Sequence, residues 1–194
     1  MNINFLLFPN LETLDLFGPA EVLGHMPGSR PGYFSLAGGL IETSQKALIM
    51  TQKACEMIPS VLVVPGGQGT RTLAADSGFL DALRDLARPS AWVLSVCTGS
   101  ALLAAAGLLD GLKAAGNKRA WEWSTGLGPK VKWQKRARWV SDGRYYTSAG
   151  ISAGIDMSLG FVSDRLGPQA AEEIAGRMEY VWNSCPDQDP FALD

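Results

Sequence analysis

The stretch that decides the fold is residues 91–100, AWVLSV followed by CTGS, which leads directly into the apolar run ALLAAAGLL at residues 101–109. A short apolar run, a sharp turn and a helical segment in succession predict a buried strand, an elbow and a helix. Cys97 occupies the elbow. Unpaired N–H groups and the helix dipole favour negative charge there, so we expect Cys97 to have a lowered thiol pKa and to act as a nucleophile.

Strand-like segments alternate with helical ones along the rest of the chain, which is typical of an open, mostly parallel α/β sheet with helices on both faces. We expect strands at residues 3–8, 33–37, 61–64 and 91–96, and hairpins at residues 40–51 and 131–148. Helices are expected at residues 18–25, 76–87, 152–166 and 168–182, with a loosely ordered tail from residue 186. A chain of 194 residues fits a single domain, residues 1–194.

Composition excludes several classes of protein. The net charge of −2 gives no excess for binding nucleic acid, and five basic residues between 130 and 138 are expected on a solvated strand face. The apolar runs are too short to span a membrane, and the N-terminus lacks the features of a signal peptide. Three irregularly spaced cysteines and a single histidine predict a cytoplasmic protein without disulfides or a metal site.

Asp15 lies in an apolar segment after the first expected strand. One interpretation is a helix cap. The other is an acid beside Cys97, because functional groups of open α/β sheets gather at the carboxyl ends of the strands. Apolar surroundings would raise the carboxyl pKa and let it exchange protons near neutral pH.

The loop PGGQG at residues 65–69 follows the apolar strand VLVV. Gly66 and Gly67 are candidates to present backbone N–H groups to an anion next to Cys97, together with the N–H of Thr98. A plain turn between strand and helix is the alternative.

The only histidine, His25, is ten residues beyond Asp15 and is expected on the order of 10–15 Å from the site. We therefore expect no Cys–His pair in this chain, which disfavours peptidase and amidase chemistry. Cys55 and Cys185 are expected to be inert.

Four motifs together resemble the ThiJ/PfpI superfamily, which has a flavodoxin-like, glutamine-amidotransferase-type fold. They are LDLFGP at residues 14–19, VPGGQG at 64–69, SVCTGS at 95–100 and AGISAGID at 149–156, and the match covers nearly the whole chain. Within the superfamily, Asp15 and the Cys-Thr-Gly elbow look most like isocyanide hydratases and the amidotransferase-like domains of certain transcription regulators.

The resemblance implies that Cys97 is the nucleophile and Asp15 the acid or base that contacts it. Thr98 would supply an N–H and a hydroxyl to the pocket, and Gly67 a second N–H. The resemblance also implies a small-molecule substrate, a homodimer whose pocket lies near the interface, and no cofactor. Ile151, Tyr180 and Trp182 would line the substrate pocket, although large aromatic residues there are as typical of core or dimer contacts.

The chain departs from the family pattern after the elbow helix. Relatives commonly read Ala-Thr-Thr-His-Trp there, whereas this chain reads AAGNK at residues 114–118, so Asn117 stands at the usual histidine. The resemblance then implies a lyase that hydrates an isocyanide to an N-substituted formamide through a Cys97 thioimidate. The alternatives are a non-catalytic redox sensor or chaperone-like protein, an amidotransferase-like binding module, and a glyoxalase-like enzyme.

Overall fold

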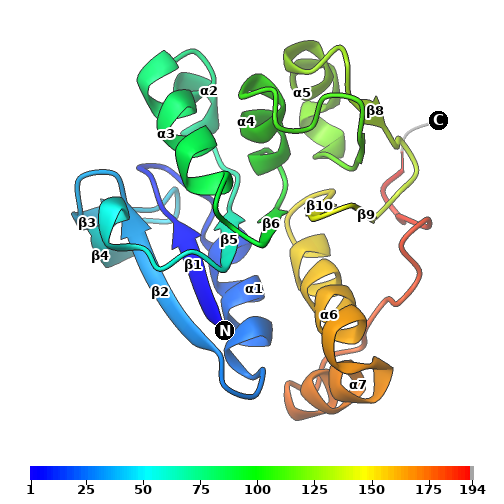
Figure 1. Cartoon of the computed structure of the whole chain (residues 1–194). Helices are drawn as coiled ribbons and strands as arrows, with labels where there is room; N and C mark the ends of the chain where they lie inside the picture. Colours follow the sequence, from blue (N-terminus) through cyan, green and yellow to red (C-terminus); the bar gives the residue numbers. More distant parts are fainter. Residues whose placement is uncertain (193–194) are drawn as a thin grey trace.

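The computed structural model describes residues 1–192, and an eight-stranded sheet forms its centre (Figure 1). In order across the sheet, the strands are β3 (Gly39–Glu42), β4 (Leu48–Lys53), β2 (Arg30–Ser35), β1 (Asn2–Leu6), β5 (Val61–Val64), β6 (Trp92–Ser95), β10 (Tyr145–Ser148) and β9 (Trp139–Asp142). Every pair between β4 and β10 is parallel, while β3 and β9 are antiparallel to their neighbours. The predicted mostly parallel α/β sheet is confirmed.

Helices form two groups that cover the sheet (Figure 1). The first group is α1 (Thr13–Gly24), α6 (Ala153–Leu166) and α7 (Pro168–Arg177), in which α6 packs against both others. The second group is α2 (Thr70–Leu73), α3 (Ser77–Ala87), α4 (Gly99–Ala105) and α5 (Trp121–Leu127), linked through α4. All four residues of β5 are buried, as expected for a strand covered on both faces.

Several short elements complete the chain. They are the 3₁₀ turns η1 (Ala54–Glu56) and η2 (Lys118–Ala120), and a separate two-stranded sheet of β7 (Lys113–Ala114) and β8 (Lys132–Trp133). The hairpin expected at residues 131–148 is confirmed for the antiparallel pair β9 and β10, but its first strand does not reach back to residue 131, because β8 belongs to a different sheet. No helix among residues 1–192 combines the length and apolar character needed to cross a bilayer.

The first helix begins earlier than predicted. Gly18 and Pro19 were expected to open it, but α1 starts at Thr13 and contains Pro19 in its interior. A proline lacks an N–H, so the carbonyl of Asp15 loses its intrahelical partner at that turn. A Cβ on Gly18 would lie 2.8 Å from Ile155, so the close packing of α1 on α6 accounts for the adjacent glycine.

The last helix ends earlier than predicted, at Arg177 instead of Trp182. Glu179 has a φ of 51°, in the left-handed region where a non-glycine residue ends a helix. Beyond it, the hydroxyl of Tyr180 donates to Oδ1 of Asp156 and the indole of Trp182 donates to the Asp156 carbonyl. Contacts with α6 therefore outweigh the helical pattern of the sequence.

Arg138 corrects the prediction for the basic cluster, because its side chain is buried while the other four members are exposed. Its guanidinium pairs with Asp156 at 2.6 Å and with Asp189 at 3.4 Å. The tail from residue 186 was expected to be loosely ordered. As far as residue 192 it is irregular but anchored, with Asp189 buried, and residues 193–194 lie outside the described part.

The topology places three loops together. β2 lies on one side of β1, whereas β5 and β6 follow on the other, so the order of connections reverses between β1 and β5. In open α/β sheets, ligands bind outside the carboxyl ends of strands at such a reversal. The segments that leave β1, β5 and β6 there carry Asp15, Gly66 and Cys97 respectively.

Candidate active site

Cys97 lies at a sharp turn between β6 and α4, as the sequence predicts. Its φ is 58°, in the left-handed region that a residue with a side chain adopts at a cost of about 1–3 kcal/mol. The hydroxyl of Ser100 donates to the Cys97 carbonyl at 2.9 Å and so supports the turn from the helix side. The elbow brings the thiol into contact with Asp15 of α1 and with Asn117, which precedes η2.

Asp15 is completely buried in the first turn of α1, so it is not the helix cap that was one of its two predicted roles. Its Oδ2 accepts a hydrogen bond from the Gly66 N–H at 3.0 Å. No nitrogen or oxygen donor among residues 1–192 reaches its Oδ1. The remaining neighbour that acts on the carboxyl through a hydrogen bond is the Cys97 thiol. The acid and the thiol therefore form a pair.

Burial is the largest cause of the pKa shifts of both Asp15 and Cys97. Burial raises the pKa of Asp15 to about 8, the Gly66 N–H lowers it, the charge of Glu12 raises it, and Cys97 lowers it. Burial also raises the pKa of the Cys97 thiol, and the Asp15 carboxylate raises it further. The expectation of a lowered thiol pKa is therefore wrong, because loss of hydration outweighs the position at the start of α4. At pH 7 both groups hold their protons.

Two donors favour the ionised sulfur. The Thr98 N–H and the Asn117 side chain lower the pKa of Cys97 through hydrogen bonds to it. Nδ2 of Asn117 lies 3.0 Å from Sγ, and Oδ1 of the same amide accepts from the Ala120 N–H at 2.9 Å. That second bond fixes the orientation of the amide, with the nitrogen toward the sulfur. Asn117 was read from the sequence only as a missing histidine, and no local pattern showed this contact.

The two loop glycines do not have the predicted role. The Gly66 N–H is bonded to Asp15, and the Gly67 N–H donates to Oγ1 of Thr98 at 3.0 Å. Both donors are thus committed within the protein, and Thr98 N–H and Asn117 replace them as the groups that face the sulfur. A Cβ on Gly66 would lie 2.6 Å from the Thr98 nitrogen and 2.8 Å from Asp15, so the position requires glycine.

Cys97 is 6% exposed, and it opens into a cavity of about 390 Å³. The lining is Glu12, Gly67, Gln68, Arg71, Cys97, Thr98, Asn117, Arg119, Ala120 and Ile151. Of the predicted pocket residues, Ile151 lies in this lining, whereas Tyr180 does not. A neighbouring cavity of about 320 Å³ shares Asn117, Arg119 and Ile151 and extends to Phe191 of the tail.

Comparison with known proteins identifies the family of this chain. The model of the DJ-1/PfpI family matches residues 1–164, most of the chain and all of the elements that carry the site. The chain belongs to the DJ-1/PfpI family. It is 35% identical to an isonitrile hydratase of Pseudomonas putida, in an alignment that covers 100% of this chain and 86% of that protein. It is also 28% identical to the transcriptional regulator CdhR of Pseudomonas aeruginosa, of which the match covers 52%.

Solved structures of the DJ-1/PfpI family have the same fold. A ThiJ/PfpI family protein from Pseudomonas syringae superposes with a TM-score of 0.84 at 30% identity, over 97% of this chain and 76% of the other. DJ-1beta of Drosophila melanogaster superposes with a TM-score of 0.79 at 20% identity, over 93% of this chain and 98% of the other. The flavodoxin-like architecture predicted from the sequence motifs is confirmed.

The other chemistry-bearing residues lie elsewhere in this DJ-1/PfpI fold. Tyr180 belongs to the Asp156 cluster described above, and His25 pairs with Glu21 on α1 at 3.1 Å. Neither lines the Cys97 cavity. Cys55 is exposed and Cys185 half-buried, and both are free thiols.

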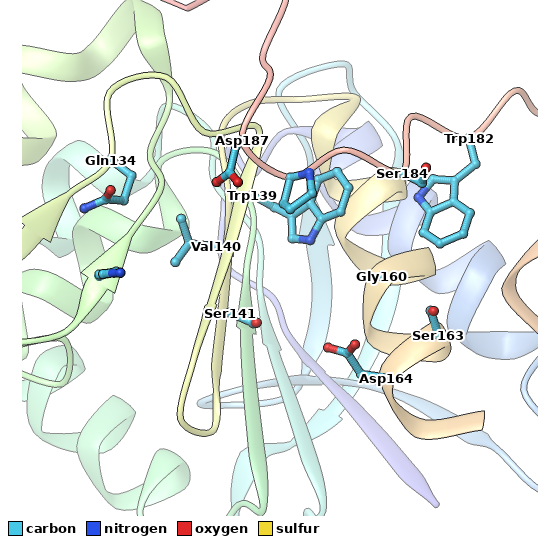
Figure 2. Close-up of a pocket in the computed structure, with 12 residues that line it drawn as sticks. Gln134, Trp139, Val140, Ser141, Gly160, Ser163, Asp164, Trp182, Ser184 and Asp187 are labelled. Atoms are coloured by element: carbon cyan, nitrogen blue, oxygen red, sulfur yellow. The ribbon is translucent and has the colours of Figure 1, made fainter. Parts of the chain in front are cut away.

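A third cavity, of about 360 Å³, lies away from these two, between β9, α6 and the segment that follows α7. Figure 2 shows Trp139, Ser141, Asp164 and Trp182 around it. It shares no lining residue with the Cys97 cavity and contains no cysteine or histidine. The reactive groups of the site are therefore confined to the first cavity.

Proposed function

We propose that this protein is an isocyanide hydratase-like lyase that converts R–N≡C and water to the formamide R–NH–CHO. The observation that carries the proposal is the buried Cys97–Asp15 pair, in which a carboxyl with a pKa of about 8 is hydrogen-bonded to the thiol. The 35% identity to an isonitrile hydratase over the whole chain supports the same chemistry.

The first half of the reaction starts from the form in which Asp15 is ionised, and Asp15 accepts the thiol proton as Sγ of Cys97 attacks the terminal carbon of the isocyanide. The S–H bond breaks and an S–C bond forms. Asp15 then delivers this proton to the same carbon and gives the thioimidate R–N=CH–S–Cys97. A pKa near the working pH suits a group that must both accept and donate a proton. Thr98 N–H and the Asn117 amide stabilise the sulfur while it carries negative charge.

In the second half, Asp15 removes a proton from water as the oxygen adds to the thioimidate carbon. Asp15 delivers this proton to the nitrogen and is ionised again, and the adduct is R–NH–CH(OH)–S–Cys97. The C–S bond then breaks, the sulfur leaves as thiolate, and the hydroxyl proton is returned through Asp15 to the thiol. The sum is addition of one water to one isocyanide, with the pair restored to its starting state.

This reaction suits a site without imidazole. Hydrolysis of a peptide or amide needs an acid to protonate a leaving amine, and histidine usually supplies it. The chain's single histidine, His25, does not line the cavity, and Asn117 occupies the position next to the sulfur. Addition to an isocyanide expels no leaving amine, so one carboxyl suffices for its proton transfers.

A redox sensor is the second candidate among the sequence-based alternatives. Sensor cysteines are exposed and have low pKa values. Cys97 is only 6% exposed, and its burial raises the pKa of the thiol. These properties favour a nucleophile that loses its proton only during attack.

We also propose, from the family, that the chain is a single-domain cytoplasmic protein that acts as a homodimer on a small molecule.

The test is to incubate the purified protein with cyclohexyl isocyanide and follow N-cyclohexylformamide by liquid chromatography. We expect turnover by the native protein and by the Cys55→Ala control, which removes an exposed thiol away from the cavity. Cys97→Ala is expected to abolish it. The proposal would be refuted if the native protein turned over the isocyanide no faster than the Cys97→Ala variant.

A further inference from the structure

Two arginines from separate elements share the cavity of Cys97. Arg71 belongs to α2 and Arg119 to η2, and both side chains are exposed in the lining. Among residues 1–192, neither guanidinium has an ion-pair partner. The Arg71 guanidinium stacks 3.8 Å above the ring of Trp123, which restricts its position while leaving its N–H edge free to donate.

The lining of the Cys97 cavity carries less negative charge than positive charge. Among residues 1–192, Glu12 is the one acidic residue of the lining. Its Oε1 accepts a hydrogen bond from Gln45, and its charge acts on Asp15. Asp15 itself is neutral at pH 7, because its pKa is about 8. The lining therefore holds two guanidinium groups against one carboxylate, although the whole chain has a net charge of −2.

The arginines are not placed to activate the thiol. The groups that shift the pKa values of Cys97 and Asp15 include Glu12, Gly66, Thr98 and Asn117 but neither guanidinium. Attack requires the terminal carbon of an isocyanide to reach Sγ, so its substituent must extend from the sulfur into the rest of the cavity. The far end of that substituent is the part that Arg71 and Arg119 can contact.

We infer that the substrate carries a carboxylate on the group attached to the isocyanide nitrogen, and that Arg71 and Arg119 bind it. The planar guanidinium fork matches a carboxylate with two parallel hydrogen bonds, which a neutral alkyl group cannot accept. The isocyanide in this inference rests on the proposed function. The preference for an anion rests only on the two arginines of the cavity lining. It makes Arg71 and Arg119 specificity-determining residues.

The test compares potassium isocyanoacetate with methyl isocyanoacetate, which differ in charge at the same reacting group. We expect the native protein to have a kcat/KM about tenfold or more higher for the anion, a ratio that falls as ionic strength rises. Arg71→Gln and Arg119→Gln should each reduce this ratio several-fold, and the double variant should bring it close to one. Arg177→Gln, an exposed arginine of α7 outside the cavity, should leave the ratio unchanged.

A second measurement separates this inference from the proposed function. Calorimetry with Cys97→Ala protein measures binding of N-formylglycine and its methyl ester, the corresponding products, without turnover. Tighter binding of the carboxylate, weakened by adding Arg71→Gln, would support the anion site even if no isocyanide were hydrated. Equal use of both isocyanides together with equal binding of both formamides would overturn the inference and leave the hydratase activity standing.

Discussion

The side-chain amide of Asn117 donates from Nδ2 to Sγ of Cys97 at 3.0 Å, while its Oδ1 accepts a hydrogen bond from the N–H of Ala120, the last residue of η2. An amide donor keeps its proton at every pH, so it can stabilise a thiolate but cannot protonate a leaving group. The nucleophile thus has an electrostatic partner in Asn117 and a proton-transfer partner in Asp15. Two functions that one histidine often combines are divided between two residues.

Replacing Asn117 by alanine should raise the thiol pKa of Cys97 and lower kcat/KM for isocyanide about 10–100-fold. The reason is the loss of a hydrogen bond to a charged group, which is typically worth about 1.5–3 kcal/mol. The thiol pKa is measured from the pH dependence of iodoacetamide alkylation, in a Cys55→Ala, Cys185→Ala background. Asn117→Asp should raise the pKa further, because it places a carboxylate against the sulfur. An unchanged pKa in both variants would show that the contact has no electrostatic role.

The rate should follow the protonation of the Cys97–Asp15 pair. With two protons on the pair, Asp15 cannot accept the thiol proton, and with none it cannot donate one to the isocyanide carbon. Since the pKa of Asp15 is about 8 and that of the thiol is higher, kcat/KM should rise with pH toward about 8 and fall at more alkaline pH. Asp15→Asn should lower kcat/KM about 10²–10⁴-fold and abolish the rising limb. A rate independent of pH between 6 and 8 would contradict this.

Asp15 should also cost stability at alkaline pH. Its carboxyl keeps a proton up to about pH 8 in the folded protein, whereas its ordinary pKa is 3.8. Between these values the folded state binds the extra proton, so the free energy of unfolding falls as pH rises. Asp15→Asn should therefore unfold at nearly the same urea concentration as the native protein at pH 4. At pH 8 it should be more stable, on the order of a few kcal/mol. A difference of the same size at both pH values would exclude Asp15 as its cause.

Parts of the fold and site that depend on local sequence could be predicted. Residues 61–64 and the elbow at Cys97 have strong local signals, because a wholly apolar run and a strand–turn–helix transition leave few alternatives. Asp76, the first residue of the helix expected at residues 76–87, likewise lies at the helix start, where its side chain caps α3. Even the convergence of Asp15 with Cys97 followed from the topology of parallel sheets.

Features set by distant contacts could not be predicted. The thiol pKa depends on burial by segments far apart in sequence, and the Asn117–Cys97 contact spans 20 residues. Tyr180 continues a helical pattern, but Asp156 of α6 binds its hydroxyl and the helix ends before it. In the sequence, Arg138 looks like its exposed basic neighbours, but in the structure it is buried in ion pairs with Asp156 and Asp189. In each case the deciding partner is remote in the chain.

The buried Arg138 should be important for stability. Replacing it by methionine removes the partner of two buried carboxylates, Asp156 and Asp189, and breaking such a pair typically costs about 3–5 kcal/mol. Urea unfolding should show this loss. The matched control is Lys130→Met, because Lys130 is 76% exposed and pairs with the half-exposed Asp110, so its loss should cost about 0–1 kcal/mol. Similar urea midpoints for both variants would mean that the ion pairs of Arg138 with Asp156 and Asp189 add no net stability.

Gly150 gives a way to move the Asn117 amide without changing it. A Cβ at Gly150 would collide with Nδ2 of Asn117 and lie 3.5 Å from Sγ of Cys97, so Gly150→Ala should push the amide off the sulfur. Its φ is not positive, so the backbone accepts alanine. We expect Gly150→Ala to raise the thiol pKa and lower kcat/KM as Asn117→Ala does.

The double variant should be little worse than either single one, because both remove the same interaction. Gly176→Ala, where a Cβ meets no atom within 4 Å, serves as the control and should leave the thiol pKa unchanged. If the losses in the Gly150→Ala and Asn117→Ala variants multiplied, Gly150 would act on the site by a route other than the amide. The hydrogen bond to sulfur would then explain only the Asn117 part of the rate.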